Sequence, residues 1–179
     1  SYKKAIELNP DLYQAYHNMG RTYLGLDQHA EAIRIYKKAI DLNHENESEL
    51  SQSYCELGIV YNNLGEYEEA IRNYKKALEL DPASAEVYIN FGNTYKNLNR
   101  IDDAIWNYQK GSALDTSNTA AHTNLGVIYN ELEQYEDAIR SYKRAIELDP
   151  ELVGAYSGLG NTYEDLKQYG NAITNYRKA

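Results

Sequence analysis

The sequence predicts an all-α fold in which one helical hairpin is repeated and its copies stack into a solenoid. Five glycines, Gly20, Gly58, Gly92, Gly126 and Gly160, are separated by 38, 34, 34 and 34 residues. Apolar residues around each glycine recur at the three- and four-residue steps of an amphipathic helix. A single hairpin of about 34 residues cannot bury both of its faces, so the copies are expected to pack against one another.

Each copy contains two helices with fixed small and aromatic positions. In the copy around Gly92, Tyr88, Tyr95 and Leu98 mark the first helix, and Ala104 and Tyr108 mark the second after a polar break at 99–100. The tyrosine sixteen residues after each glycine is Tyr36, Tyr74, Tyr108, Tyr142 or Tyr176, and the alanine twelve after is Ala32, Ala70, Ala104, Ala138 or Ala172. Proline after Asn or Asp, at Pro10, Pro82 and Pro150, is expected to stop each second helix.

These offsets divide the chain into one solenoid domain of consecutive repeats. Residues 1–12 are the second helix of a partial repeat; the repeats span 13–50, with a four-residue insertion, then 51–84, 85–118, 119–152 and 153–179, the last truncated. The insertion near 44–50 is expected to lengthen a turn or add one helical turn. Gly111 and Thr116 depart from the pattern in the third repeat, and Gly154 and Gly158 are expected to weaken the first helix of the fifth.

The segment from His122 to Pro150, HTNLGVIYNELEQYEDAIRSYKRAIELDP, resembles a tetratricopeptide repeat throughout. The shared pattern is an aromatic position, Leu-Gly, Tyr, Ala, a second aromatic, Ala and Pro at fixed offsets. The resemblance covers essentially the whole chain. It implies a right-handed superhelical solenoid of antiparallel helix pairs whose first helices line a concave groove, and a role in holding another protein or a peptide.

Composition narrows the classes of partner and compartment. The chain has 179 residues and a formal net charge of −9, which disfavours binding to nucleic acid. Of the 19 tyrosines, all but Tyr13 fall on repeat positions that are predicted to be buried, so core packing explains them better than base stacking. No apolar run or signal region indicates a membrane, and a single cysteine, Cys55, suits a reducing compartment. The expected location is intracellular, in the cytoplasm.

No arrangement of residues indicates catalysis, a metal site or a cofactor. The histidines form no zinc-binding motif, and Cys55 has no second cysteine at metal-site spacing. The Gly158-Leu159-Gly160 string lies inside a predicted helix rather than between a strand and a helix, so it is no dinucleotide fingerprint. Among the histidines, only His17 is predicted to face the groove. The chain is therefore predicted not to be an enzyme.

Asparagine dominates the predicted groove face of the first helices. An asparagine both donates and accepts hydrogen bonds, so a row of them could read a peptide main chain. The alternative is that these amides bond neighbouring helices or water. The candidate peptide-binding residues are Asn18, Asn62, Asn90, Asn93, Asn124, Asn130 and Asn161, with Arg21 and Lys96 for acidic groups. The asparagine two residues before the glycine resembles the pattern in the repeat domain of O-GlcNAc transferase. Repeat proteins that bind chaperones use Lys and Arg in the groove, and the absence of these residues at the matching positions disfavours binding of a chaperone C-terminal carboxylate.

Three functional classes fit these features. The favoured one is a protein-interaction scaffold that binds an extended peptide or a partner protein in its concave groove. The alternatives are the substrate-adaptor portion of a larger enzyme, such as a glycosyltransferase, and a self-assembling array. Weak self-association is expected through uncapped apolar ends, with Ile6 and Leu8 at one end and Ile173 and Tyr176 at the other. Trp106 is predicted to be exposed on the convex side, as an interface residue or lying over Lys110.

Overall fold

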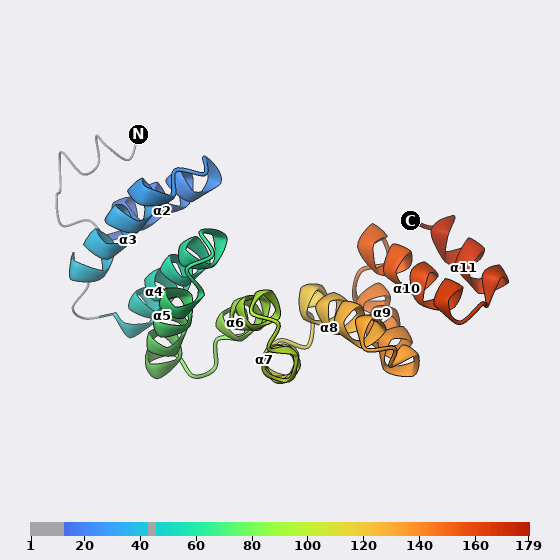
Figure 1. Cartoon of the computed structure of the whole chain (residues 1–179). Coiled ribbons are helices and arrows are strands. Elements are labelled where there is room, and N and C mark those ends of the chain that lie inside the picture. The colour runs from blue at the N-terminus through green and yellow to red at the C-terminus, as the bar shows by residue number, and fades with distance from the viewer. Residues whose placement is uncertain (1–12, 43–45) are drawn as a thin grey trace. The chain divides into compact units, whose positions relative to one another are not determined.

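The computed structural model describes residues 13–42 and 46–179, and within these ranges the regular structure is entirely helical (Figure 1). The predicted all-α class is therefore confirmed. The predicted partial repeat at 1–12, with the end residues Ile6 and Leu8, lies outside the described residues, as does His44.

The chain divides into two compact units, and the boundary between Thr94 and Tyr95 lies inside α6. The described helices of unit 1 are α2 (Tyr13–Gly25), α3 (His29–Leu42), α4 (Glu47–Asn63), α5 (Tyr67–Leu80) and most of α6 (Ala85–Asn97). Unit 2 contains the end of α6, then α7 (Ile101–Leu114), α8 (Thr119–Glu131), α9 (Tyr135–Leu148), α10 (Val153–Asp165) and α11 (Tyr169–Tyr176).

Within each unit, consecutive helices form antiparallel hairpins that stack on their neighbours. The hairpins α2–α3 and α4–α5 pack together in unit 1 through contacts of α4 with both α3 and α2. In unit 2, α8–α9 packs against α10–α11 in the same way, through contacts of α10 with both α9 and α8. The first helices α4 and α10 therefore each contact both the first and the second helix of the preceding hairpin.

The repeated glycine allows the two helices of a hairpin to approach closely. A Cβ atom built on Gly58 would lie 2.6 Å from the ring of Tyr74, and one built on Gly126 would lie 2.7 Å from the ring of Tyr142. Gly20 and Tyr36, and Gly160 and Tyr176, repeat this arrangement. The sixteen-residue spacing thus places a tyrosine ring directly against the glycine backbone, where any side chain would collide with it.

A left-handed residue ends the first helix of each hairpin. Asp27, Gly65, Asn99, Glu133 and Lys167 have φ values of 55°, 75°, 56°, 59° and 59°. The N–H group that follows this residue bonds back to the carbonyl of the repeat tyrosine, as in Glu66 to Tyr61 at 2.9 Å and Gln134 to Tyr129 at 2.8 Å. The polar break predicted between the two helices is therefore a helix-ending motif with a fixed backbone conformation.

Aspartate organises the turn between one hairpin and the next. The Asp81 carboxylate accepts a hydrogen bond from Ala83 N at 3.1 Å, and Asp115 accepts one from Ser117 N at 3.0 Å. Asp149 accepts the equivalent bond from Glu151 N at 3.0 Å. Because Thr116 stands where Pro82 and Pro150 stand and this bond still forms, the aspartate can stop the second helix without proline.

The extra residues before the second hairpin are accommodated partly in α4. This helix has 17 residues, whereas α6, α8 and α10 have 13 each. The Asn46 side chain caps it by accepting a hydrogen bond from Glu49 N at 3.2 Å. The additional turn carries Glu47 and Glu49 beside the helix N-terminus, where negative charge is favourable.

The core of each unit follows the repeated alanines and second-helix tyrosines. Ala32, Ala70, Ala104 and Ala138 are fully buried, as are Tyr36, Tyr74 and Tyr108. The expectation that all repeat tyrosines occupy the buried face needs correction, because Tyr16, Tyr54 and Tyr88 are only half-buried and Tyr169 is exposed. These rings lie at the outer edges of the helix packing.

Candidate protein-interaction surface

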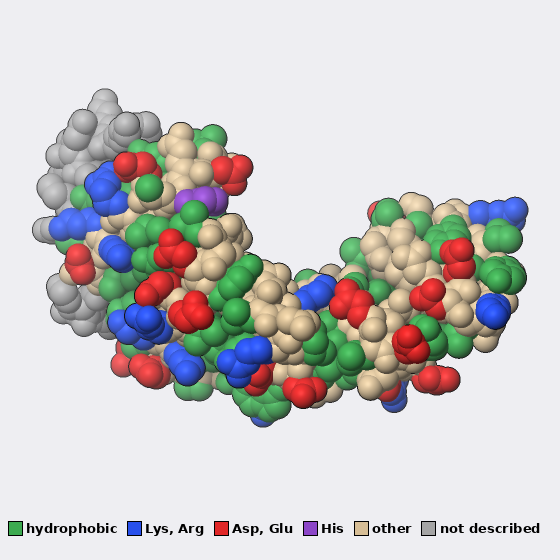
Figure 2. All heavy atoms as spheres, viewed as in Figure 1, with side chains coloured by type: hydrophobic (Ala, Val, Ile, Leu, Met, Phe, Trp, Pro, Cys, Tyr) green, Lys and Arg blue, Asp and Glu red, His purple; other side chains and the backbone are tan. Residues whose placement is uncertain are grey.

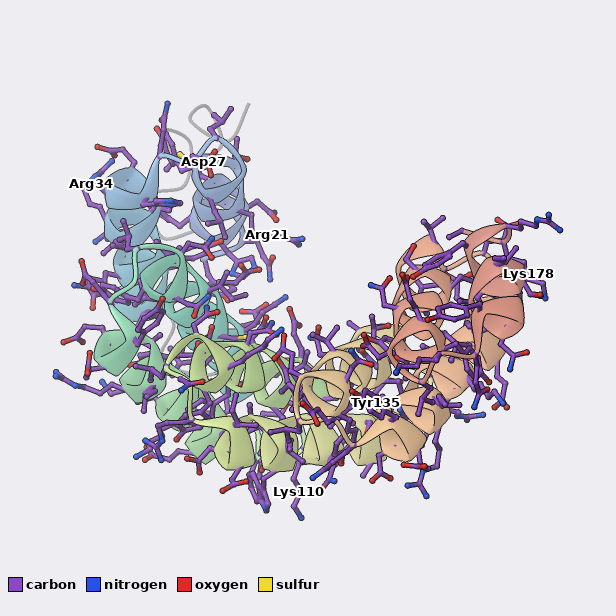
Figure 3. The ribbon with its side chains drawn as sticks, turned by 45° about the vertical axis from the view of Figure 1, so that its right-hand side comes forward. Arg21, Asp27, Arg34, Lys110, Tyr135 and Lys178 are labelled. Atoms are coloured by element: carbon purple, nitrogen blue, oxygen red, sulfur yellow. The ribbon has the colours of Figure 1, made fainter. Side chains whose placement is uncertain are left out.

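The predicted groove residues of unit 1 come from α2, α4 and α6, the first helices of their hairpins. We call these positions together the first-helix face of unit 1; it contains Asn18, Arg21, Glu56, Asn62, Asn90 and Asn93. In Figure 3, Arg21 on α2 and Arg34 on α3 project to opposite sides of the first hairpin. The first and second helices therefore present separate surfaces within this hairpin.

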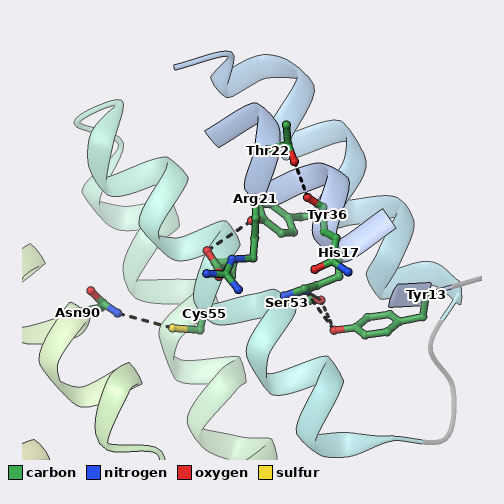
Figure 4. Close-up of polar contacts among 10 residues, drawn as sticks. Tyr13, His17, Arg21, Thr22, Tyr36, Ser53, Cys55 and Asn90 are labelled. Atoms are coloured by element: carbon green, nitrogen blue, oxygen red, sulfur yellow. Dashed lines mark hydrogen bonds and ion pairs between the residues drawn. The ribbon is translucent and has the colours of Figure 1, made fainter. Parts of the chain in front are cut away.

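A charged bridge connects α2 to α4 on this face. Arg21 Nε lies 3.5 Å from Glu56 Oε1, and Tyr36 donates its hydroxyl to Glu56 Oε2 at 3.4 Å (Figure 4). Burial raises the pKa of Glu56, although the Arg21 charge opposes this. Arg21 thus already faces a carboxylate of its own chain, and its side chain remains 62% exposed for a second acidic group.

Beneath this bridge lies a buried polar cluster that was not predicted from the sequence. The Tyr13 hydroxyl lies 2.8 Å from Ser53 Oγ and 3.3 Å from His17 Nδ1, and it donates to the carbonyl of Glu49 (Figure 4). Burial raises the pKa of Tyr13 to about 12. The one signal in the sequence was Tyr13 itself, because it is the only tyrosine off the repeat positions.

The prediction that His17 faces the groove is wrong. Its ring is only 3% exposed and is packed between Tyr13, at a centroid distance of 5.7 Å, and Tyr36, at 5.8 Å. Burial, and then the nearby Arg21 charge, lower the pKa of His17. Cys55, at the equivalent position of the next repeat, is also buried. This position points between adjacent first helices rather than outward.

Asparagine side chains connect α4 to α6. Thr94 donates its hydroxyl to Asn62 Oδ1 at 2.9 Å, and Asn90 Nδ2 lies 3.9 Å from the Cys55 sulfur (Figure 4). Asn90 is half-buried, and its amide oxygen has no hydrogen-bond partner among the described residues. Asn62 and Asn90 thus each use one side-chain atom to bond a neighbouring helix, as in the alternative to peptide binding given by the sequence. Asn90 still has its amide oxygen as an acceptor.

Unit 2 has an equivalent face formed by the end of α6 with α8 and α10. Lys96 Nζ lies 3.9 Å from Glu131 Oε1, and Asn130 donates to Asp165 Oδ2 at 3.0 Å. We call this the first-helix face of unit 2; it contains Lys96, Asn124, Asn130, Glu131, Asn161, Glu164 and Asp165. Here too the side chains of successive first helices meet.

The amides of this second face differ in what they can offer to a ligand. Asn130 Oδ1 is buried without a partner among the described residues. Asn161 is exposed and accepts a hydrogen bond from the Tyr176 hydroxyl at 2.8 Å, which leaves its N–H₂ group to solvent. Asn93 and Asn124 are half-buried and already engaged with other groups. Asn161 is therefore the most accessible amide of the row.

Trp106 lies on α7, the second helix of its hairpin. Its side chain is 51% exposed, as the sequence predicted, and Lys110 Nζ lies 5.6 Å from its ring centroid. This geometry is the cation–π pair expected one helical turn apart. In Figure 3, Lys110 projects outward from α7.

Charges of both signs are mixed over the surface seen in Figure 2. Several arginines of the second helices are paired with carboxylates three residues away, such as Arg72 with Glu69 at 2.9 Å and Arg144 with Glu147 at 3.0 Å. Over residues 13–42 and 46–179, no group of three His, Cys, Asp or Glu side chains has a metal-binding arrangement. In the same ranges, every helix is too short or too polar to cross a bilayer.

Comparison with known families decides the assignment of the chain. A tetratricopeptide repeat model matches residues 11–83 and 49–117, and a second model, described as a TPR repeat, matches residues 126–167. The chain belongs to the tetratricopeptide repeat family. Such proteins bind other proteins or peptides, so membership supports a general role in protein interaction for this tetratricopeptide repeat chain. No curated protein sequence matches it.

Solved structures of other repeat proteins share the fold. A crystal structure of MamA is 28% identical, with a TM-score of 0.75, and the match covers 89% of this chain and 91% of MamA. YrrB, described as a TPR protein with an unusual peptide-binding site, is 23% identical with a TM-score of 0.69 over 99% of this chain and 90% of its own. Pseudomonas aeruginosa PilF is 20% identical with a TM-score of 0.84, over 93% and 74%. The last two likenesses concern the fold alone.

Proposed function

We propose that this protein is a non-catalytic interaction scaffold whose first-helix faces bind an extended peptide segment of a partner protein. The observation that carries the proposal is the unused hydrogen-bonding atom on each face: Asn90 keeps an acceptor in unit 1, and Asn161 keeps a donor in unit 2, beside their bonds to the protein. An extended peptide presents alternating N–H and C=O groups, which such amides can pair with.

The charged residues of the two faces add a local preference. Arg21 is largely exposed beside the mostly buried Glu56, so an acidic side chain of the peptide can approach Arg21 in unit 1. On the face of unit 2, Glu131, Glu164 and Asp165 are exposed, while Lys96 is partly covered and paired with Glu131. We therefore propose that the face of unit 1 favours acidic segments, and the face of unit 2 favours basic ones.

Peptides selected from a random library on the whole chain would test this function. We expect the double variant Asn18→Ala with Asn90→Ala to bind the selected peptides about tenfold more weakly, because each lost hydrogen bond contributes about 0.5–1.5 kcal/mol. Isothermal titration calorimetry would measure the affinities. Asn171→Ala on α11 is the matched control, since Asn171 is exposed and bonds only Gln168 locally.

The selected peptides should bind the control variant as tightly as they bind the parent. Equal affinity of the parent and the Asn18/Asn90 double variant would place the binding surface elsewhere. Trp106 is then the next surface to examine, through Trp106→Ala. Circular dichroism would establish that each variant retains the helical content of the parent.

A further inference from the structure

A cavity in unit 2 lies on the side of the hairpins where the second helices are, away from the first-helix face. It has a volume of about 710 Å³ and is lined by α7, α8 and α9. Leu125 and Ile139 supply its apolar lining, and His122, Tyr129 and Arg144 contribute polar groups. Gln109 donates to the Tyr129 hydroxyl at 3.1 Å at one side. The lining also includes the charged residues Glu136, Asp137, Arg140, Lys143 and Glu147. The volume lies in the range of about 300–1,000 Å³ that is usual for ligand sites.

The equivalent groove in unit 1 shows what normally fills this position. It lies between α3, α4 and α5 and measures about 400 Å³. There the ring of Tyr54 lies under Lys76, with Nζ 5.2 Å from the ring centroid. The same pair recurs in the last hairpin, where Lys178 lies 5.5 Å from the ring centroid of Tyr156. In these two hairpins, an aromatic ring under a cation occupies this position.

The hairpin α8–α9 lacks that ring. His122 stands where Tyr54 and Tyr156 stand, and Arg144 stands where Lys76 and Lys178 stand. Arg144 instead forms an ion pair with Glu147 at 3.0 Å. An imidazole is smaller than a phenol, and the cavity beside His122 is also wider than the groove of unit 1, about 710 Å³ against about 400 Å³. Burial, and then the Arg144 charge, lower the pKa of His122, so its ring is neutral near pH 7 and does not add a second cation.

We propose that this cavity binds an aromatic side chain of a protein partner. The ring would enter over Leu125 and Ile139 and occupy the space that the phenol of Tyr54 fills in unit 1. It would lie beside the Arg144 guanidinium, which replaces the lysine of the other hairpins. The cation selects an aromatic ring over an aliphatic side chain of similar size, because only the ring offers a negative face.

This binding site is independent of the peptide-binding function proposed for the first-helix faces. The cavity residues come from α7, α8 and α9 and include none of the asparagines of those faces. Variants in the cavity should therefore leave the affinity of library-selected groove peptides unchanged. The two proposals can fail separately.

The test uses the blocked tripeptides Gly-Tyr-Gly and Gly-Leu-Gly as probes, with nuclear magnetic resonance titration of the whole chain. We expect the tyrosine probe to shift the backbone amide signals of Gln109, Tyr129 and Ile139, and the leucine probe to bind at least fivefold more weakly. His122→Tyr should restore the internal ring and weaken the tyrosine probe at least tenfold. It should keep the fold, because tyrosine is the residue at this position in the neighbouring hairpins.

Two further variants make the test decisive. Arg144→Gln changes a partly exposed side chain and should reduce the preference for tyrosine over leucine without changing the fold. Tyr54→His should open the unit 1 groove and create tyrosine-induced shifts near Lys76. Unchanged binding of the tyrosine probe in both His122→Tyr and Arg144→Gln would overturn the proposal, as would equal binding of the two probes by the parent.

Discussion

The buried His17 shows how one side chain can make a repeat interface sensitive to pH. It is held between Tyr13 and Tyr36, near Ser53 on α4, with Arg21 on its own helix. Among the described residues, the charge of Glu49 on α4 favours its protonated form. Because burial outweighs this attraction, the pKa of His17 is lowered from its ordinary value of 6.5.

The sign of the pH effect follows from this shift. Below pH 6.5 the unfolded chain takes up a proton at His17 before the folded chain does, so the free energy of unfolding falls as the pH falls through 6.5 toward the lower folded-state pKa. Glu56, whose folded-state pKa is raised from 4.5, acts in the opposite sense: its protonation favours the folded state as the pH falls through that raised value.

We expect His17→Gln to lose less stability than the parent between pH 7.5 and pH 5.5. Urea unfolding at the two pH values, followed by circular dichroism, would measure the difference. The imidazole signals of His17 in a proton titration should also give a folded-state pKa below 6.5. An identical pH dependence in the parent and the variant would contradict this account.

At the scale of one helix, α10 contains glycines with opposite roles. A Cβ atom built on Gly158 would lie 2.5 Å from the ring of Tyr142, whereas one built on Gly154 would meet nothing within 4 Å. Both glycines are predicted from the sequence to weaken the helix. That interpretation suits Gly154, but Gly158 makes room for the second-helix tyrosine of the preceding hairpin.

Alanine substitutions at these two positions should therefore change stability in opposite directions. Gly158→Ala is expected to cost about 1–3 kcal/mol, because a buried ring must move. Gly154→Ala is expected to stabilise by about 0.5–1 kcal/mol, since alanine loses less backbone entropy in a helix. Urea unfolding of both variants beside the parent would measure the changes. Destabilisation of similar size in the two variants would contradict this account of α10.

The helices of this fold could be predicted because the same contact between two helices recurs in successive repeats. The glycine–tyrosine spacing is visible in the sequence, and it corresponds to a ring placed against helix backbone in four hairpins. The left-handed turn residue could not be predicted in the same way, because Asp27, Glu133 and Lys167 share a φ value but no side-chain chemistry. Backbone hydrogen bonds fix that conformation instead, because the N–H group after this residue donates to the carbonyl of the repeat tyrosine.

The candidate site was less predictable than the fold. A helical wheel placed Asn90 and Asn161 correctly on first helices, but it could not tell which atoms already have partners. The prediction for His17 was wrong because the position of a residue around one helix does not show which neighbouring helices cover it, and α2 packs against both α3 and α4. The replacement of a repeat tyrosine by His122 can be read from the sequence. The cavity beside it depends on the packing of three helices, which the sequence pattern does not describe.

At the scale of the whole molecule, α11 exposes apolar side chains at positions that can be compared with those of α9. On α9, Tyr142 is only 3% exposed because the next hairpin packs over it, and Ile139 is half-buried. Their equivalents on α11, Ile173 and Tyr176, are 51% and 39% exposed. Tyr176 is also held to α10 through Asn161 and Glu164, at 2.8 and 2.7 Å, so its ring stays in place on this surface.

We expect this apolar surface to cause weak self-association of the 179-residue chain. Ile173→Lys should reduce it, because a charge would have to be buried wherever another helix packs on α11. Sedimentation equilibrium at rising protein concentration would measure the average mass. Thr174→Lys adds the same charge at the next position, which is exposed, and should leave association closer to that of the parent. A strictly monomeric parent at millimolar concentration, or equal association of the parent and Ile173→Lys, would show that α11 does not mediate contacts between copies.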